Sequence, residues 1–146
     1  MWRMHEGSTS WGEKYKIQAL YDDAEVLRRM LKIFTLKELF PTIEWNNISK
    51  EVGKALAFNN IASIFSARNA YKDAIRYYQQ SIAEIPNEKA FFYMGINYAK
   101  ISEADNAIKH IKKAQELNPQ LLSNTENIEV LRDLDDKIVG DIIEKI

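Results

Sequence analysis

The chain has 146 residues, of which 46% are hydrophobic and 28% are charged, and its formal net charge is −1. These values are typical of one globular domain, and the near-zero charge argues against nucleic acid or an anionic membrane surface as a partner. The absence of cysteine excludes disulfides, thiolate catalysis and thiolate metal sites. Neither an apolar signal core in residues 1–10 nor a run of roughly 20 apolar residues is found, so we expect a cytoplasmic protein.

The upstream third of the chain carries a helical pattern of its own. Apolar residues at helical spacing predict a helix over 22–34. They are Ala24, Leu27, Met30, Leu31 and Phe34. Residues 36–40 are expected to add a short turn before Pro41, with Trp45 packing on the long connection. The next helix is predicted to begin after Asn47 or Ser49, because either side chain can cap it.

The centre of the chain contains one pattern twice. Pro86 and Pro119 lie 33 residues apart, and alignment on them brings two sets of seven residues into register. The first set is Phe58, Ile61, Ala62, Phe65, Ala74, Tyr78 and Pro86. The second set is Phe91, Met94, Gly95, Tyr98, Ala107, Ile111 and Pro119. The first four positions of each set predict an amphipathic helix, and the next two predict a second helix after a short turn.

Small residues occur where the two helices of each unit must approach closely. Ala62 with Ala74 fills these positions in the first unit, and Gly95 with Ala107 fills them in the second. The proline after the second helix ends that helix, since its ring clashes with the preceding turn. Each unit is therefore expected to be an antiparallel helix hairpin.

This pattern resembles the tetratricopeptide repeat, whose signature is W-x2-L-G-x2-Y, then A-x3-F, then P. The departures are mild. Ser81 stands where the family prefers alanine, and the first unit is one residue short at its Pro86-Asn87 junction. The resemblance covers 65 of the 146 residues, positions 55–119. It implies an all-α fold, an α-solenoid of antiparallel helix hairpins with a right-handed superhelix.

The resemblance also implies how the chain is divided. Residues 1–146 are expected to form a single domain of this type. Its parts are a degenerate N-terminal hairpin at 8–40, a connection and helix start at 41–54, repeats at 55–87 and 88–120, and a C-terminal capping helix segment at 121–146. Such arrays need about three units and covered ends to be stable, so the flanking segments are expected to close the two clear repeats. In the last segment, Leu131-Arg132-Asp133 resembles the element that precedes the closing helix of many such arrays.

Candidate binding residues come from the same resemblance, because first helices of successive units line a concave groove in that family. The positions carried over are Leu56, Asn59, Asn60, Ser63, Lys89, Phe92, Tyr93, Ile96 and Lys100. Phe92, Tyr93 and Ile96 are expected to form an exposed anchor rimmed by lysines, as anchors of this kind dominate binding energy in interfaces. In the alternative interpretation, Phe92 and Ile96 pack under the C-terminal segment.

The expected function is a protein-protein interaction scaffold that binds a peptide or helix of another protein in the groove. The alternative is a self-association module or assembly subunit, a homo-oligomer that stacks through its helical ends. We expect neither an enzyme nor a cofactor or metal, because His5 and His110 lack ligand spacing and the glycines form no phosphate loop. His110 is expected to lie exposed among lysines. Nucleic acid and membranes are not expected partners.

One subclass of the resembled family, the co-chaperones, grips a C-terminal carboxylate with defined lysine, asparagine and arginine residues. Asn60 and Lys89 match two of these positions, whereas Thr9 and Glu13 replace the first pair and Tyr93 replaces the arginine. The carboxylate clamp is incomplete. We therefore predict that the chain does not bind chaperone tails.

Overall fold

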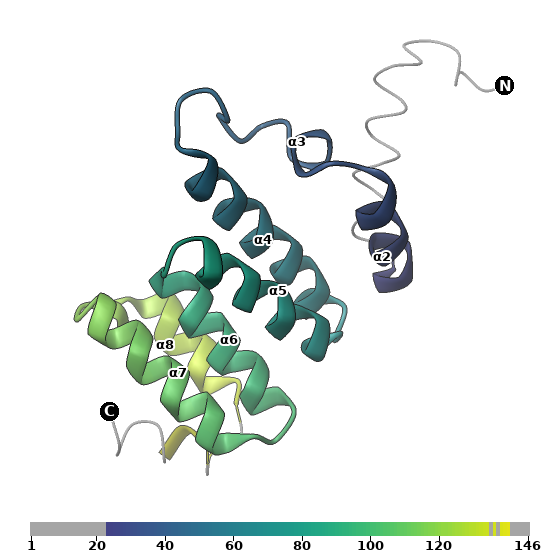
Figure 1. Cartoon of the computed structure of the whole chain (residues 1–146). Coiled ribbons are helices and arrows are strands. Elements are labelled where there is room, and N and C mark those ends of the chain that lie inside the picture. Colours follow the sequence, from purple (N-terminus) through teal and green to yellow (C-terminus); the bar gives the residue numbers. More distant parts are fainter. Residues whose placement is uncertain (1–22, 135, 137, 141–146) are drawn as a thin grey trace, which may run out of the picture.

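The structure is a computed structural model, and it describes residues 23–134, 136 and 138–140. Every regular element among these residues is a helix, so the fold is all-α (Figure 1). The elements are α2 (Ala24–Ile33), α3 (Leu36–Leu39), α4 (Lys50–Ala67), α5 (Tyr71–Glu84), α6 (Glu88–Lys100), α7 (Ala104–Leu117), the 3-10 turn η1 (Leu121–Ser123) and α8 (Thr125–Arg132). Within the described ranges, no helix is long and apolar enough to cross a bilayer.

Polar side chains cap five of these helices at the N-terminus, and Thr35 caps α3 in a capping box with Glu38. Asp23, Ser49, Asn87 and Asn124 each accept a hydrogen bond from a backbone N–H in the first turn of α2, α4, α6 and α8. Ser49 was one of the two predicted caps of the helix that carries Phe58, and the prediction is confirmed. The helix predicted over 22–34 is present as α2, and the turn expected at 36–40 is present as α3. The first helix expected for the N-terminal hairpin at 8–40 falls before α2, outside the residues that the structure describes.

Two helix hairpins form the centre of the molecule, α4 with α5 and α6 with α7, and α5 packs on α6 between them (Figure 1). The turns of the two hairpins have the same backbone geometry. Asn69 in the first and Ser102 in the second have positive φ values of 61° and 64°. The next residue in each turn donates its N–H five residues back at 2.9 Å, Ala70 to Phe65 and Glu103 to Tyr98. The predicted hairpins are therefore present, and their turns repeat.

Gly95 marks the closest approach of α6 and α7. A Cβ placed on Gly95 would lie 2.6 Å from Cγ1 of Ile111 and 2.9 Å from the carbonyl oxygen of Ala107. Contacts this short do not occur for a real Cβ, so only glycine fits the crossing without a shift of α7. The expectation that Gly95 and Ala107 permit close packing is confirmed.

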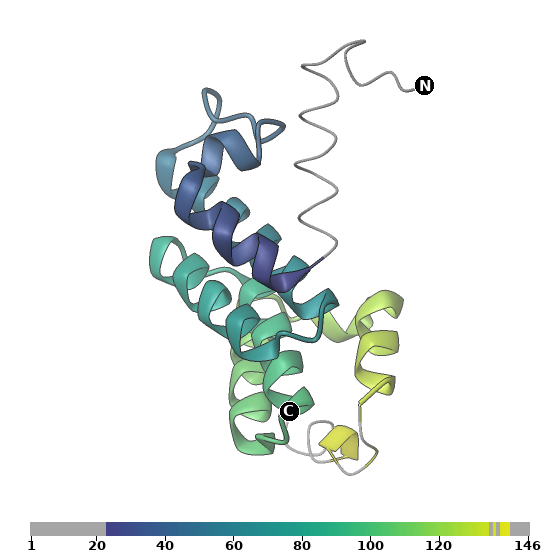
Figure 2. The ribbon, with the colours of Figure 1, turned by 90° about the vertical axis from the view of Figure 1, so that its right-hand side faces the viewer.

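The buried side chains form two clusters. The N-terminal cluster joins α2, α3, α4, α5 and one face of α6, and consists of Leu27, Met30, Leu39, Ile61, Ala62, Ile64, Phe65, Ala74, Ile75, Tyr78, Ala90 and Met94. The C-terminal cluster joins the other face of α6 to α7, η1 and α8, and consists of Phe92, Ile96, Ala99, Ala107, Ile108, Ile111, Ala114, Leu121, Leu131 and Leu134. Helix α6 thus lies between the two clusters. In Figure 1, α2 lies at the right of the molecule and α8 at the left, and Figure 2 shows the molecule from the side of α2.

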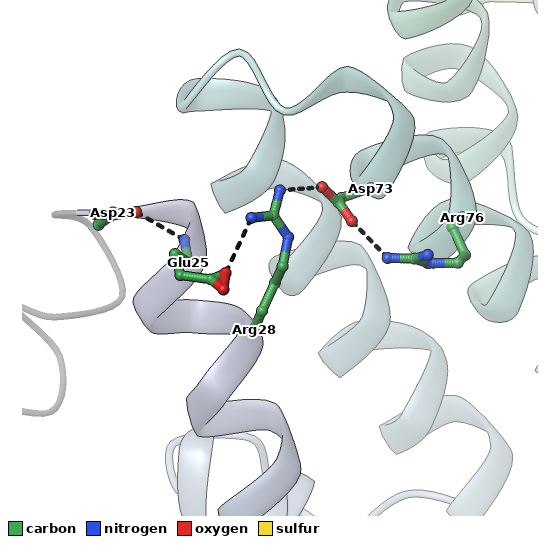
Figure 3. Close-up of polar contacts among 5 residues, drawn as sticks. All are labelled: Asp23, Glu25, Arg28, Asp73 and Arg76. Atoms are coloured by element: carbon green, nitrogen blue, oxygen red, sulfur yellow. Dashed lines mark hydrogen bonds and ion pairs between the residues drawn. The ribbon is translucent and has the colours of Figure 1, made fainter.

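An ion-pair network fastens α2 to the first hairpin. The Arg28 guanidinium donates to Oδ2 of Asp73 on α5 at 2.6 Å and also pairs with Glu25, while Arg76 pairs with the other oxygen of Asp73 (Figure 3). The hydrogen bond to Asp73 raises the pKa of Arg28. Arg28 also lies over the ring of Phe65, with Cζ 5.7 Å from the ring centroid. These contacts fix α2 across the end of the α4–α5 turn.

Trp45 packs the long connection onto α4, as expected. Its ring lies so close to Gly53 that a Cβ there would be 2.6 Å from the indole carbon Cε3. The indole N–H donates to the carbonyl oxygen of Phe40 at 3.0 Å. One face of the indole is therefore held against the backbone of α4.

Candidate functional site

The first candidate site is a cleft between α4 and α6, the first helices of the two hairpins. Its volume is about 250 Å³, and its lining is Val52, Ala55, Leu56, Asn59, Ile85, Asn87, Glu88 and Lys89. Three residues predicted from the sequence, Leu56, Asn59 and Lys89, meet here although they come from different hairpins. Leu56 is 44% exposed, so much of its side chain is open to contact.

A chain of hydrogen bonds holds the floor of this cleft. The Asn59 amide nitrogen donates to Oδ1 of Asn87 at 3.1 Å, and the Asn87 amide nitrogen donates to the Ser81 hydroxyl at 3.1 Å. The Ser81 hydroxyl donates in turn to the carbonyl oxygen of Ala55 at 3.0 Å. The network joins α4, α5 and α6. It also explains Ser81, which departs from the family's alanine, because its hydroxyl has a buried acceptor.

The orientation of the Asn59 amide follows from this network. Oδ1 of Asn87 accepts the backbone N–H of Ala90 at 3.0 Å, so the group facing it from Asn59 must be the NH2. Asn59 is only 5% exposed, and its Oδ1 has no hydrogen-bond partner in the described structure. A buried acceptor without a partner costs free energy, so this oxygen lowers the stability of the fold beneath the cleft.

The predicted anchor does not form. Phe92 is 1% exposed and Ile96 is 6% exposed, and both belong to the C-terminal cluster with Leu121, Leu131 and Leu134. The expectation that these two residues lie exposed in a groove is wrong, and the alternative, packing under the C-terminal segment, is confirmed. The cause is that η1, α8 and Leu134 supply the apolar cover that the second hairpin lacks by itself.

Tyr93 lies beside the same segment and is half-buried. Burial raises the pKa of its phenol, and the nearby Glu126 carboxylate on α8 raises it further. Its ring is 5.1 Å from that of Phe92, edge to face. Tyr93 is therefore a packing residue at the border of the C-terminal cluster.

The remaining predicted site residues are exposed but lie apart from the cleft. Asn60, Ser63 and Lys100 have exposed side chains and are absent from the cleft lining. The structure thus brings together three of the nine predicted residues. The other five lining residues were not predicted: Val52, Ala55, Ile85, Asn87 and Glu88. Asn87 could have been predicted as a helix N-cap, because an asparagine followed by a glutamate and a helical stretch is a typical N-cap pattern.

His110 also differs from its expected position. Its ring is half-buried, 5.1 Å from the ring of Tyr98 and 6.3 Å from that of Phe91, and Nδ1 lies 2.7 Å from the carbonyl oxygen of Asn106. The expectation of a fully exposed histidine is wrong, because the aromatic side chains of α6 cover one face of the ring. Over the described residues, no group of three or more histidines and carboxylates is placed to hold a metal ion.

Comparison of the sequence with protein-family models and with characterised proteins finds no match to either. The interpretation of the cleft therefore depends on its geometry alone. An apolar wall with one exposed leucine and a lysine at the rim suits binding of an apolar side chain of a partner.

Proposed function

We propose that this chain is a protein-binding scaffold of the tetratricopeptide type, an α-solenoid with a right-handed superhelix, and that a segment of a partner protein lies in the α4–α6 cleft. Support comes from positions that recur 33 residues apart. Asn69 and Ser102 have the same left-handed backbone, and Ala62 and Gly95 are both buried. This recurrence favours one ancestral hairpin used twice.

The cleft itself is the observation that carries the proposed function. It lies between the first helices of two successive hairpins, where an extended or helical segment can touch both repeats at once. Leu56 and Val52 offer apolar surface to a partner side chain, and Lys89 offers a positive charge at the rim. Covering Leu56 alone contributes about 1 kcal/mol of binding free energy, since nearly half of the side chain is still exposed.

Site-specific photo-crosslinking tests the proposal. A photoreactive amino acid is placed at Leu56 in one variant and at Gln80, an exposed residue on α5, in a matched control. We expect the Leu56 variant to crosslink a defined peptide that mass spectrometry identifies, and the Gln80 variant not to do so. The peptide is then synthesised and its affinity for the unmodified chain is measured.

The decisive variant is Leu56→Asp, which places a charge on the apolar wall without touching the core. We expect it to weaken peptide binding by about tenfold or more while the melting temperature falls by no more than about 5 °C. Equal affinity of the peptide for Leu56→Asp and for the original chain would remove the cleft as the binding site.

Self-association through the helical ends is the second candidate, and two exposed apolar residues favour it. Ile33 at the end of α2 is 72% exposed, and Leu117 at the end of α7 is 46% exposed. Light scattering over a hundredfold range of concentration tests this candidate. A constant monomer mass would eliminate it, and an increase that Leu117→Ser or Ile33→Ser abolishes would support it.

A further inference from the structure

A second cleft lies on the opposite side of α4, where the long connection returns to the helix. Its volume is about 420 Å³, and it is lined by Thr35, Leu36, Lys37, Trp45, Lys50 and Lys54. This volume falls in the range of pockets that hold small ligands, which is roughly 300 to 1,000 Å³. The proposed function makes no use of these residues.

The apolar side of this cleft is formed by the indole of Trp45 and by Leu36. Gly53 packs against the indole from α4, and Lys37 lies over the ring with Nζ 5.9 Å from its centroid. The indole N–H is already bonded to Phe40, so the ring presents a flat surface and no free donor. Together with Leu36, it provides a floor suited to stacking a planar group.

The rim of the cleft is positive throughout. Lys37, Lys50 and Lys54 converge on it from α3 and α4, and no acidic side chain is among the lining residues. In the part of the chain that the structure describes, none of these three ammonium groups has a carboxylate within 4.0 Å, whereas Arg28, Arg76 and Lys113 all have one. Glu38, the nearest acidic neighbour of Lys37 in sequence, bonds the backbone N–H of Thr35.

Ammonium groups that line one cleft without a carboxylate nearby repel one another, and an anion placed between them relieves this repulsion. We propose that this cleft binds a small organic anion with a planar ring, the ring lying on Trp45 and the negative group between the three lysines. The ligand must therefore meet two separate requirements: a planar ring that stacks on Trp45 and a negative charge that the lysines bind. A ligand with only one of them should bind weakly.

Isothermal titration with naphthalene-2-sulfonate tests both requirements on the full chain. We expect saturable binding at one site that weakens as salt rises, because the charge contribution is screened. Methanesulfonate, which lacks the ring, and 2-naphthol, which is uncharged at pH 7, are expected to bind at least about fivefold more weakly. Amide chemical shifts should change at Lys50, Lys54 and the Trp45 indole.

The variant Lys50→Gln/Lys54→Gln is expected to weaken binding by about fivefold or more, since two charges are removed from the rim. The matched control is Lys109→Gln/Lys112→Gln on α7, which changes the net charge equally at another exposed surface and should leave the affinity unchanged. Trp45→Leu is expected to abolish the preference for naphthalene-2-sulfonate over methanesulfonate. If Trp45→Leu does not fold, the Lys50→Gln/Lys54→Gln variant still tests the proposal. It is expected to fold, because Lys50 is exposed and Lys54 is half-buried.

Three results would overturn the proposal. These are the absence of saturable binding, equal affinity of the Lys50/Lys54 variant and the original chain, and tighter binding of a polyglutamate peptide than of naphthalene-2-sulfonate. The last result would mean that the surface docks an acidic protein segment. None of these results bears on Leu56 and the α4–α6 cleft, so this proposal and the proposed function fail independently.

Discussion

Gly95 lies directly against Ile111, with only 2.6 Å between the position of a Cβ on Gly95 and Cγ1 of Ile111. Gly95→Ala is therefore expected to lower the free energy of unfolding by about 1 to 3 kcal/mol, although alanine has the higher helix propensity. Urea denaturation measures the change. Gly140→Ala is the control, because a Cβ there has no atom within 4 Å and the stability should stay the same or rise by up to about 1 kcal/mol.

Phe92→Ala is expected to lower the free energy of unfolding by about 3 to 5 kcal/mol, because it leaves a cavity in the C-terminal cluster. Calorimetry or urea denaturation measures this cost. Leu56→Ala removes an apolar side chain from the same layer of first helices, but Leu56 is 44% exposed and the cost should be under about 1 kcal/mol. Similar costs for the two variants would contradict the burial of Phe92.

Asn87→Ala should destabilise the fold more than Asn124→Ala. Both residues cap a helix, and loss of a cap costs about 1 kcal/mol. Asn87 also bonds Asn59 and Ser81, so its removal leaves a buried amide and a buried hydroxyl short of partners, for a further cost of about 1 to 3 kcal/mol. Thermal denaturation of the two variants side by side provides the comparison, and equal costs would argue against the network.

The stability of the protein is expected to fall as the pH rises above 10. Burial raises the pKa of Tyr78 well above its ordinary value, and Tyr93 adds a smaller effect. Above pH 10 the unfolded chain loses the phenol proton while the folded chain retains it, so the unfolded state binds fewer protons and is favoured. The slope from this one group reaches about 1.4 kcal/mol per pH unit.

Tyr78→Phe isolates this contribution, since it removes the phenol and keeps the ring. Urea denaturation at pH 8 and pH 11 should show a smaller loss of stability for Tyr78→Phe than for the original chain. Tyr71→Phe, at a less buried position, is a control that should keep the original pH dependence. An unchanged slope in Tyr78→Phe would exclude Tyr78 as its source.

The hairpins could be predicted from the sequence because each one is determined by residues close together in the chain. Three kinds of pattern act within about 30 residues: helical spacing, the small residues at Ala62 and Gly95, and the prolines that follow each unit. The structure has helices at the predicted positions and a close helix crossing at Gly95. The caps at Asp23 and Ser49 were predictable for the same reason, since a cap bonds the next few residues.

The candidate site was predicted less well, because burial of a helix face depends on residues far away. Phe92 and Ile96 have the composition of an exposed anchor when α6 is considered alone. In the structure they share a buried cluster with Leu121, Leu131 and Leu134, which come from beyond α7. The network of Asn59, Asn87 and Ser81 joins three helices, and no local pattern indicates it. The three lysines around Trp45 likewise converge only after the long connection returns to α4.

The position of α6 between the two clusters has a consequence for how the molecule unfolds. Phe91, Tyr93 and Tyr98 pack against both clusters, so neither cluster keeps its wall when α6 opens. The amides in the middle of α6 should therefore exchange hydrogen only through global unfolding, later than those of α2 or α8. Although the sequence is built from two similar units, division of the chain at Pro86 would leave two fragments that each lack half of a shared core.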